Sequence, residues 1–133
     1  MTLLLKQEQK QFMANLAHHV SAQSARSLVW ENSEYLNSYQ DDGEAVTIVR
    51  RSVPDNFWLG FHELVKLGLA RNTSPENISD EYDRSVTVSE KLLEVLLLLF
   101  SKLVHTLLGG DAGEDAGIRR RIRDPEPAET LEP

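Results

Sequence analysis

The feature that most constrains this chain is a long apolar helix, predicted over residues 88–108. Eight of the nine residues in the segment 92–100 are apolar, so the helix is apolar around most of its circumference and must be buried. Thr87 and Glu90 have the spacing of a capping box at its start, and Gly109-Gly110 can adopt the left-handed conformation that ends a helix. A small domain rarely encloses such a helix with its own residues, so we expect part of its surface to pack against another chain.

The residues expected to make that contact recur at helical spacing along the predicted helix. They are Leu93, Leu96, Leu97, Phe100, Val104 and Leu108. Because Leu97, Leu98, Phe100 and Leu108 cannot all face one core, a homodimer is the expected quaternary state.

Composition limits the class of protein further. The chain has 133 residues, which suits one compact domain over 1–108 followed by a disordered, charged tail over 109–133. The net charge of -7 argues against a phosphate backbone as the main partner, because that partner favours a basic face. The chain has no cysteine, which excludes disulfides, thiolate zinc sites and cysteine nucleophiles.

Neither the N-terminus nor the apolar helix has the pattern of a targeting or membrane-spanning segment. Only three consecutive leucines precede Lys6, too few for the apolar region of a signal peptide. Glu94, Lys102 and His105 interrupt the long helix, and charges are costly in hydrocarbon. We therefore expect no membrane partner and an intracellular location, in the cytoplasm or within a viral particle.

The remaining periodic segments predict the other elements of the fold. An amphipathic helix is expected over residues 4–22, strands over 27–30 and 45–49, a helix over 54–67, and a short strand over 85–88. Together with the long helix they predict an α+β domain, with three main helices packed on a small, mostly antiparallel sheet in the order α-β-β-α-β-α. For the segment 24–39, helical spacing of its apolar residues leaves a continuous helix as the alternative.

The helix over 54–67 is marked at both ends. Pro54 and Asp55 suit its first turn, and Gly68 can end it in the left-handed conformation, with Leu69 making the apolar contact that usually follows. Its expected buried residues are Phe57, Trp58, Phe61, Leu64 and Val65.

No motif in the chain points to catalysis. The four histidines, His18, His19, His62 and His105, have no metal-ligand spacing. The sequence also has no nucleophile elbow, phosphate-binding loop or dinucleotide fingerprint. We therefore expect a protein that is not an enzyme, with no cofactor and no metal site.

The predicted tail contains one basic cluster. Its arginines, Arg119, Arg120, Arg121 and Arg123, could contact a polyanion or a partner protein. Seven acidic residues share the segment 109–133, so a self-neutralising, solvated tail is the alternative.

Part of the chain resembles a known family. Residues 64–71, the polar loop after them, residues 83–91 and the leucine-rich helix resemble the wing and the dimerisation helix of winged-helix repressors. The resemblance implies a DNA-binding regulator, with Arg71 and Arg84 as phosphate contacts at the wing. In that family the preceding helix presents polar or basic side chains to the major groove, whereas here it carries Phe57, Trp58 and Phe61.

These observations favour a non-enzymatic interaction protein. We expect an assembly or accessory factor, of a kind that viruses or phages encode, which acts as a dimer with a protein partner in a larger complex. The alternative is a winged-helix-like transcriptional regulator whose partner is DNA.

Overall fold

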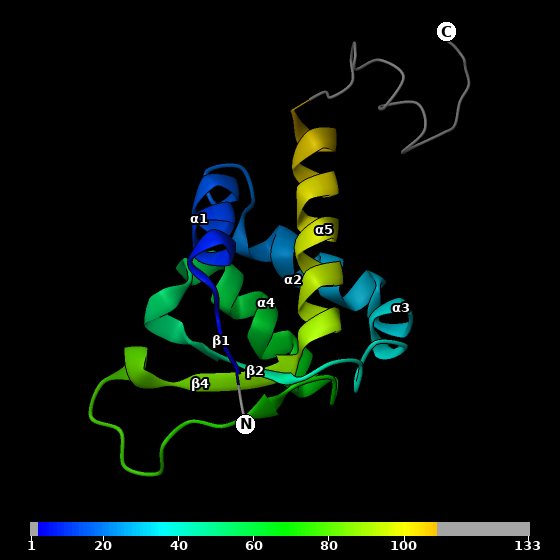
Figure 1. Ribbon diagram of the computed structural model, residues 1–133. Helices are drawn as coiled ribbons and strands as arrows, with labels where there is room; N and C mark the ends of the chain where they lie inside the picture. Colours follow the sequence, from blue (N-terminus) through cyan, green and yellow to red (C-terminus); the bar gives the residue numbers. More distant parts are fainter. Residues whose placement is uncertain (1–2, 109–133) are drawn as a thin grey trace, which may run out of the picture.

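The computed structural model describes residues 3–108 (Figure 1). In chain order its elements are β1 (Leu3–Leu4), α1 (Gln7–Leu16), α2 (Ala22–Glu31), α3 (Ser33–Asn37), β2 (Ala45–Val49), the 3-10 turn η1 (Arg50–Ser52), α4 (Asp55–Lys66), β3 (Arg71–Asn72), the 3-10 turn η2 (Glu81–Asp83), β4 (Ser85–Ser89) and α5 (Glu90–Leu107). The predicted tail, residues 109–133, lies outside the described residues.

The sheet has four strands in the order β1-β2-β4-β3. β2 and β3 both pair with β4 antiparallel, and β1 pairs with β2 parallel, which confirms the predicted small, mostly antiparallel sheet of an α+β domain. Figure 1 shows α1, α2, α4 and α5 on one side of β2 and β4. Val46 and Ile48 of β2 alternate with less buried neighbours, as expected for a strand with one face on a core.

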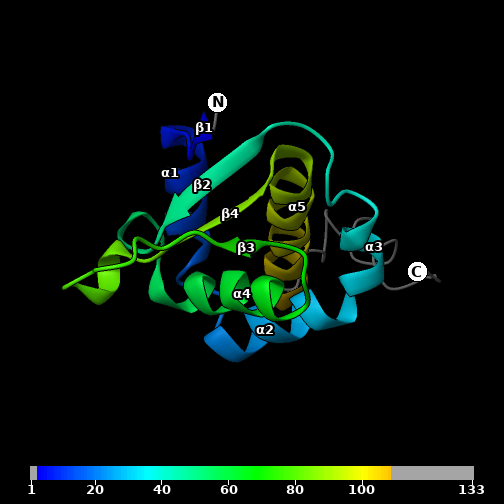
Figure 2. The same ribbon diagram turned by 90° about the horizontal axis from the view of Figure 1, so that it is seen from below.

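The long helix is the centre of the fold. Figure 2 looks nearly along α5 and shows α1, α2, α3 and α4 arranged around it. Phe100 of α5 is fully buried and packs on Phe57 of α4, with ring centroids 4.8 Å apart. The prediction of this helix is confirmed, but the helix begins at Glu90 and its cap is Ser89, the last residue of β4. The Ser89 hydroxyl accepts a hydrogen bond from the Leu92 amide at 3.2 Å, whereas Thr87 lies inside β4.

The predicted strand over 27–30 is wrong. The segment is helical, as in the alternative, but it forms two helices, α2 and α3, rather than one continuous helix. The Ser21 hydroxyl caps α2 by accepting the Ser24 amide at 3.1 Å. Packing against α4 explains why β-prone residues are helical here: Gly60 lies against α2, and a Cβ placed on it would be 3.6 Å from the Cβ of Ala25. A long-range contact therefore overrides the local preference of Leu28 and Val29.

The first predicted helix also begins later than expected. Leu3 and Leu4 form β1, in register with Val46 and Thr47 of β2, so the helix is confined to Gln7–Leu16. By contrast, the helix predicted over 54–67 is confirmed as α4, and Gly68 follows it with φ +79°, in the left-handed region.

The contact between Phe57 and Phe100 gives the first prediction. Phe100→Ala should lower the free energy of unfolding by about 3–5 kcal/mol, because it removes a fully buried ring and leaves a cavity beside α4. Urea denaturation measures this loss. Leu107→Ala, at an exposed position of the same helix, should change stability by no more than about 0.5 kcal/mol. Equal losses in the two variants would contradict the placement of Phe100 in the core.

Candidate functional site: the groove between α2 and α4

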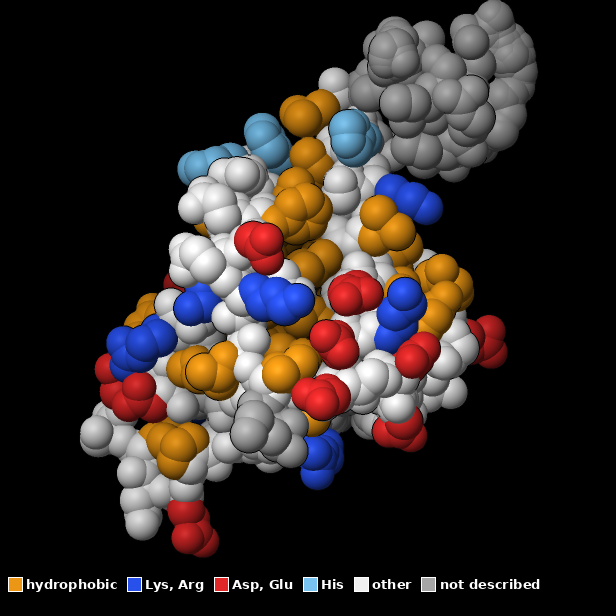
Figure 3. All heavy atoms as spheres, viewed as in Figure 1, with side chains coloured by type: hydrophobic (Ala, Val, Ile, Leu, Met, Phe, Trp, Pro, Cys, Tyr) orange, Lys and Arg blue, Asp and Glu red, His pale blue; other side chains and the backbone are white. Residues whose placement is uncertain are grey.

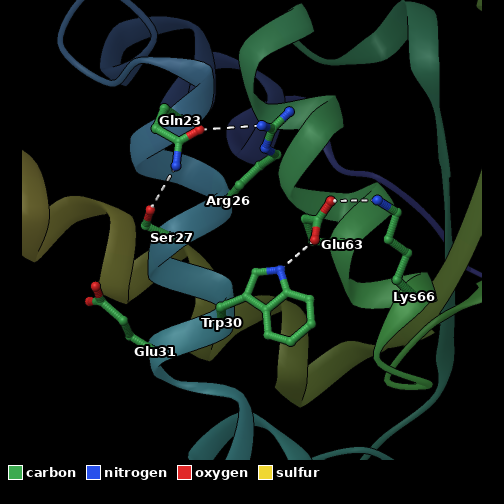
Figure 4. Close-up of a pocket in the computed structure, with 7 residues that line it drawn as sticks. All are labelled: Gln23, Arg26, Ser27, Trp30, Glu31, Glu63 and Lys66. Carbon is green, nitrogen blue, oxygen red and sulfur yellow. Dashed lines mark hydrogen bonds and ion pairs between the residues drawn. The ribbon is translucent and has the colours of Figure 1, made fainter.

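A groove of about 470 Å³ lies between α2 and α4 (Figure 4). Side chains three or four residues apart on a helix lie on one face, and that spacing brings five residues of α2 to the groove. They are Gln23, Arg26, Ser27, Trp30 and Glu31. α4 supplies Glu63 and Lys66 from the opposite side.

Trp30 is the one aromatic residue that lines the groove. Its indole is large and apolar, yet 53% of the residue surface is accessible. Figure 4 shows the ring pointing from α2 across the groove toward α4. Its Nε1–H donates a short hydrogen bond to Oε1 of Glu63, which fixes the orientation of the exposed ring.

Glu63 is the one buried carboxylate among residues 3–108, with 6% of its surface exposed. Its second oxygen lies 3.3 Å from Nζ of Lys66. The hydrogen bond from the Trp30 indole, and then the neighbouring Lys66, hold the pKa of Glu63 below its ordinary value, although burial acts in the opposite direction. The carboxylate is therefore ionised at neutral pH and already has two partners.

Arg26 occupies the other end of the groove. Its guanidinium donates to Oε1 of Gln23 at 3.2 Å, and Gln23 in turn donates to the Ser27 hydroxyl at 3.3 Å (Figure 4). No carboxylate of the described residues lies within ion-pair distance of Arg26. Beyond Trp30, Glu31 is exposed at the rim. The groove thus combines an apolar ring with charged groups of both signs, which suits contact with another protein.

The groove has no arrangement typical of catalysis. Glu63 is its one buried ionisable group, and its two hydrogen-bond partners occupy the carboxylate. Within residues 3–108 no group of three or more histidine, aspartate or glutamate side chains could hold a metal ion. The structure places His18 and His19 just after α1, His62 on α4 and His105 near the end of α5, all exposed and outside the groove.

Five of the six predicted interface residues lie in the interior of the chain itself. Leu93, Leu96, Leu97, Phe100 and Val104 are buried against the chain's own core. The reason is the helical state of residues 22–37, since α2 and α3 both pack on α5. A partner could reach these five side chains only if the domain opened.

Three leucines on or next to α5 are exposed, and Leu107, the last residue of the helix, is 53% exposed. Leu108 is 62% exposed just beyond its end, and Leu98 is 55% exposed at its middle. The arginines of the predicted tail, Arg119, Arg120, Arg121 and Arg123, lie outside the described residues.

Sequence reasoning missed the groove because it placed Trp30 in a strand. The helical spacing of Gln23, Ser27 and Trp30 was the available signal, since it puts the three on one face. Nothing local marked Glu63, whose partner Trp30 is 33 residues away in the sequence.

The segment that resembles winged-helix repressors contains a β-hairpin, but this hairpin is not a basic wing. α4 is followed by β3 and β4, which pair antiparallel. Arg84, however, forms an ion pair with Glu81, with 2.7 Å between Nε and Oε2. Arg50 forms a second ion pair with the same carboxylate oxygen at 3.1 Å. Arg71 is exposed at the start of β3, while α4 buries the apolar face that includes Trp58. The loop between β3 and β4 carries more acidic than basic side chains: Glu76, Asp80, Glu81 and Asp83 against Arg84.

Comparison with known proteins gives no relative. No protein-family model, curated protein or solved structure matches this chain. Of the helices within residues 3–108, none has both the length and the apolar character needed to cross a membrane.

The Glu63 carboxylate gives a prediction on pH. Its folded-state pKa is depressed, so its stabilising contribution is present above the unfolded-state pKa, about 4.3, and is lost as the pH falls through the lower folded-state pKa. Glu63→Gln should therefore cost about 1–3 kcal/mol of unfolding free energy at pH 7 and much less near pH 2. Urea denaturation at the two pH values measures the difference.

Glu31→Gln is the matched control, because it removes an exposed carboxylate from the rim of the same groove. It should leave stability within about 0.5 kcal/mol at both pH values. A cost of Glu63→Gln that does not change between pH 7 and pH 2 would contradict an ionised carboxylate at this position.

Proposed function

We infer that this protein is a non-enzymatic interaction protein, an assembly or accessory factor that binds a protein partner through the groove between α2 and α4 and acts as a dimer. The observation that supports this most is the exposed indole of Trp30, oriented by a buried carboxylate. Tryptophan and arginine are the residue types that most often dominate binding energy at protein interfaces, and both line this groove.

The hydrogen bond to Glu63 lowers the cost of binding. A surface side chain loses conformational freedom when a partner immobilises it, and that loss weakens binding. The Trp30 indole N–H is already satisfied and its ring is already held, so a partner gains the apolar contact without ordering the side chain. The ring is thus preorganised for contact.

The charges around the ring define the chemistry of the partner. An apolar or aromatic side chain would stack on Trp30. A carboxylate on one side of it would meet Arg26, and a basic side chain on the other would meet Glu31. The groove therefore fits a segment in which an apolar residue stands between an acidic and a basic one.

Selection from a random peptide library displayed on phage tests this function. The full chain is the bait, and the enriched peptides should contain an aromatic or large apolar residue flanked by opposite charges. Trp30→Ala should weaken binding of a selected, fluorescently labelled peptide about 30-fold in an anisotropy titration, equivalent to about 2 kcal/mol, because the main apolar contact is lost.

Tyr35→Ala is the control for this titration. Tyr35 is an exposed aromatic residue of α3 that does not line the groove, so its replacement should leave the affinity unchanged. Peptides that bind Trp30→Ala as tightly as the unaltered chain would refute a partner site in the groove.

The β3–β4 hairpin after α4 favours one second candidate, the winged-helix-like transcriptional regulator. A salt titration of duplex DNA binding separates the two functions. Binding that weakens steeply with salt would support the regulator, because phosphate contacts release counterions. Absence of binding at 50 mM salt would leave the interaction protein as the better account.

A further inference from the structure

The outer face of α5 carries a strip of exposed side chains that no other described element covers. Its residues follow one another at spacings of three or four, which places them in one line along the helix. They are Lys91, Glu94, Leu98, Lys102 and His105, and all five are exposed. Figure 3 shows acidic, basic and apolar side chains next to one another along α5.

Leu98 is the centre of this outer strip. It is 55% exposed in the middle of an 18-residue helix, where the polar face of an amphipathic helix would normally carry a charged or polar residue. Glu94 precedes it by four residues and Lys102 follows it by four. An exposed leucine thus stands midway between opposite charges, each one helical turn away.

This order of charges is complementary to that of a second copy of the strip that runs in the opposite direction. A two-fold axis through Leu98 that relates two antiparallel copies of α5 brings Leu98 against Leu98. It also brings Glu94 of each copy opposite Lys102 of the other, so two ion pairs flank the apolar contact. A parallel pairing would instead oppose Glu94 to Glu94 and Lys102 to Lys102, which is repulsive.

Only one ion pair within the described residues involves the charged groups of the strip. Lys102 has no ion-pair partner among residues 3–108. Glu94 has only a long contact to Lys91, 3.8 Å between Oε1 and Nζ, and both side chains are about half exposed. The two pairs would form about 6 Å along each helix from the axis, a distance that the long side chains of lysine and glutamate span.

We propose that a second copy of this chain docks antiparallel on the outer strip of α5, with the two-fold axis at Leu98. The proposal rests on the dimeric action inferred above and names the surface that mediates it. This surface shares no residue with the groove between α2 and α4. Because the whole interface has only two central leucines and two ion pairs, dimerisation depends on protein concentration in the micromolar range or above.

Sedimentation equilibrium of the full chain over a range of concentrations tests the dimer. Leu98→Glu should raise the dissociation constant at least about tenfold, because it puts two carboxylates against each other at the axis. Its circular dichroism and thermal midpoint should match those of the unaltered chain at low concentration, since Leu98 is not part of the core. A monomer at every concentration, or an equally strong dimer of Leu98→Glu, would overturn the proposal.

Charge exchange tests the antiparallel register. Glu94→Lys alone and Lys102→Glu alone should each weaken the dimer, because each creates like charges across the interface. The double variant Glu94→Lys/Lys102→Glu should restore it, because both pairs are then reversed. A double variant as weak as the single ones would overturn the register.

The absence of cysteine from the chain allows a direct measurement of orientation. Under mild oxidation Leu98→Cys should form a disulfide-linked dimer, because position 98 meets itself at the axis. Lys102→Cys should not cross-link to itself, but a mixture of Glu94→Cys and Lys102→Cys should cross-link between the two variants. Self-cross-linking of Lys102→Cys as fast as that of Leu98→Cys would overturn the antiparallel arrangement.

These results are separable from the test of the partner site. Leu98→Glu should keep the affinity of the full chain for a peptide selected on the groove, because Trp30 and Glu63 lie on other helices. Loss of the dimer with retained peptide binding supports two separate surfaces. If the unaltered chain does not dimerise, the α5 interface is refuted, but the proposed partner site in the groove is not affected.

Discussion

The burial of α5 is the constraint on which the rest of the structure depends. A helix that is apolar over most of its circumference needs cover on several sides, and a sheet of four short strands covers only one of them. The chain supplies the missing cover with α1, α2 and α3 and with Phe57 of α4, which packs on Phe100. The helices over 22–37 therefore help to bury α5, and its solvent exposure is concentrated on the outer strip and on its last turn.

Much of this fold could be predicted because several elements carry their signals locally. α4 and α5 have long apolar periodicity and marked ends, and β2 has four consecutive β-branched residues, so the predicted bounds of all three are close to the observed ones. β1 and α2 lack such signals. β1 exists because Leu3 pairs with Val46, and α2 is helical because it packs on α4, and neither contact is visible in a local window. The error on α2 hid both the groove and the burial of the predicted interface.

The pair of Trp30 and Glu63 shows what a buried charge contributes besides stability. Removing a carboxylate from water is costly, and an apolar residue of similar volume often stabilises a core equally well. An apolar residue could not, however, accept the indole hydrogen bond that sets the direction of the exposed ring. Lys66 offsets part of the cost from the solvent side. Glu63 therefore fixes the position of the Trp30 ring, and no apolar side chain could do this in its place.

The two proposed surfaces lie on different helices, so binding at one does not block binding at the other. The groove uses residues of α2 and α4, and the dimer uses the outer strip of α5, so one chain can engage a partner and a second copy at the same time. A two-fold dimer would present two identical grooves to a larger assembly. When both are engaged, the second binding event becomes intramolecular, and its effective concentration raises the overall affinity without any new contact. In such an assembly, a weak dimer and a small groove would together be sufficient for tight binding to a repeated partner.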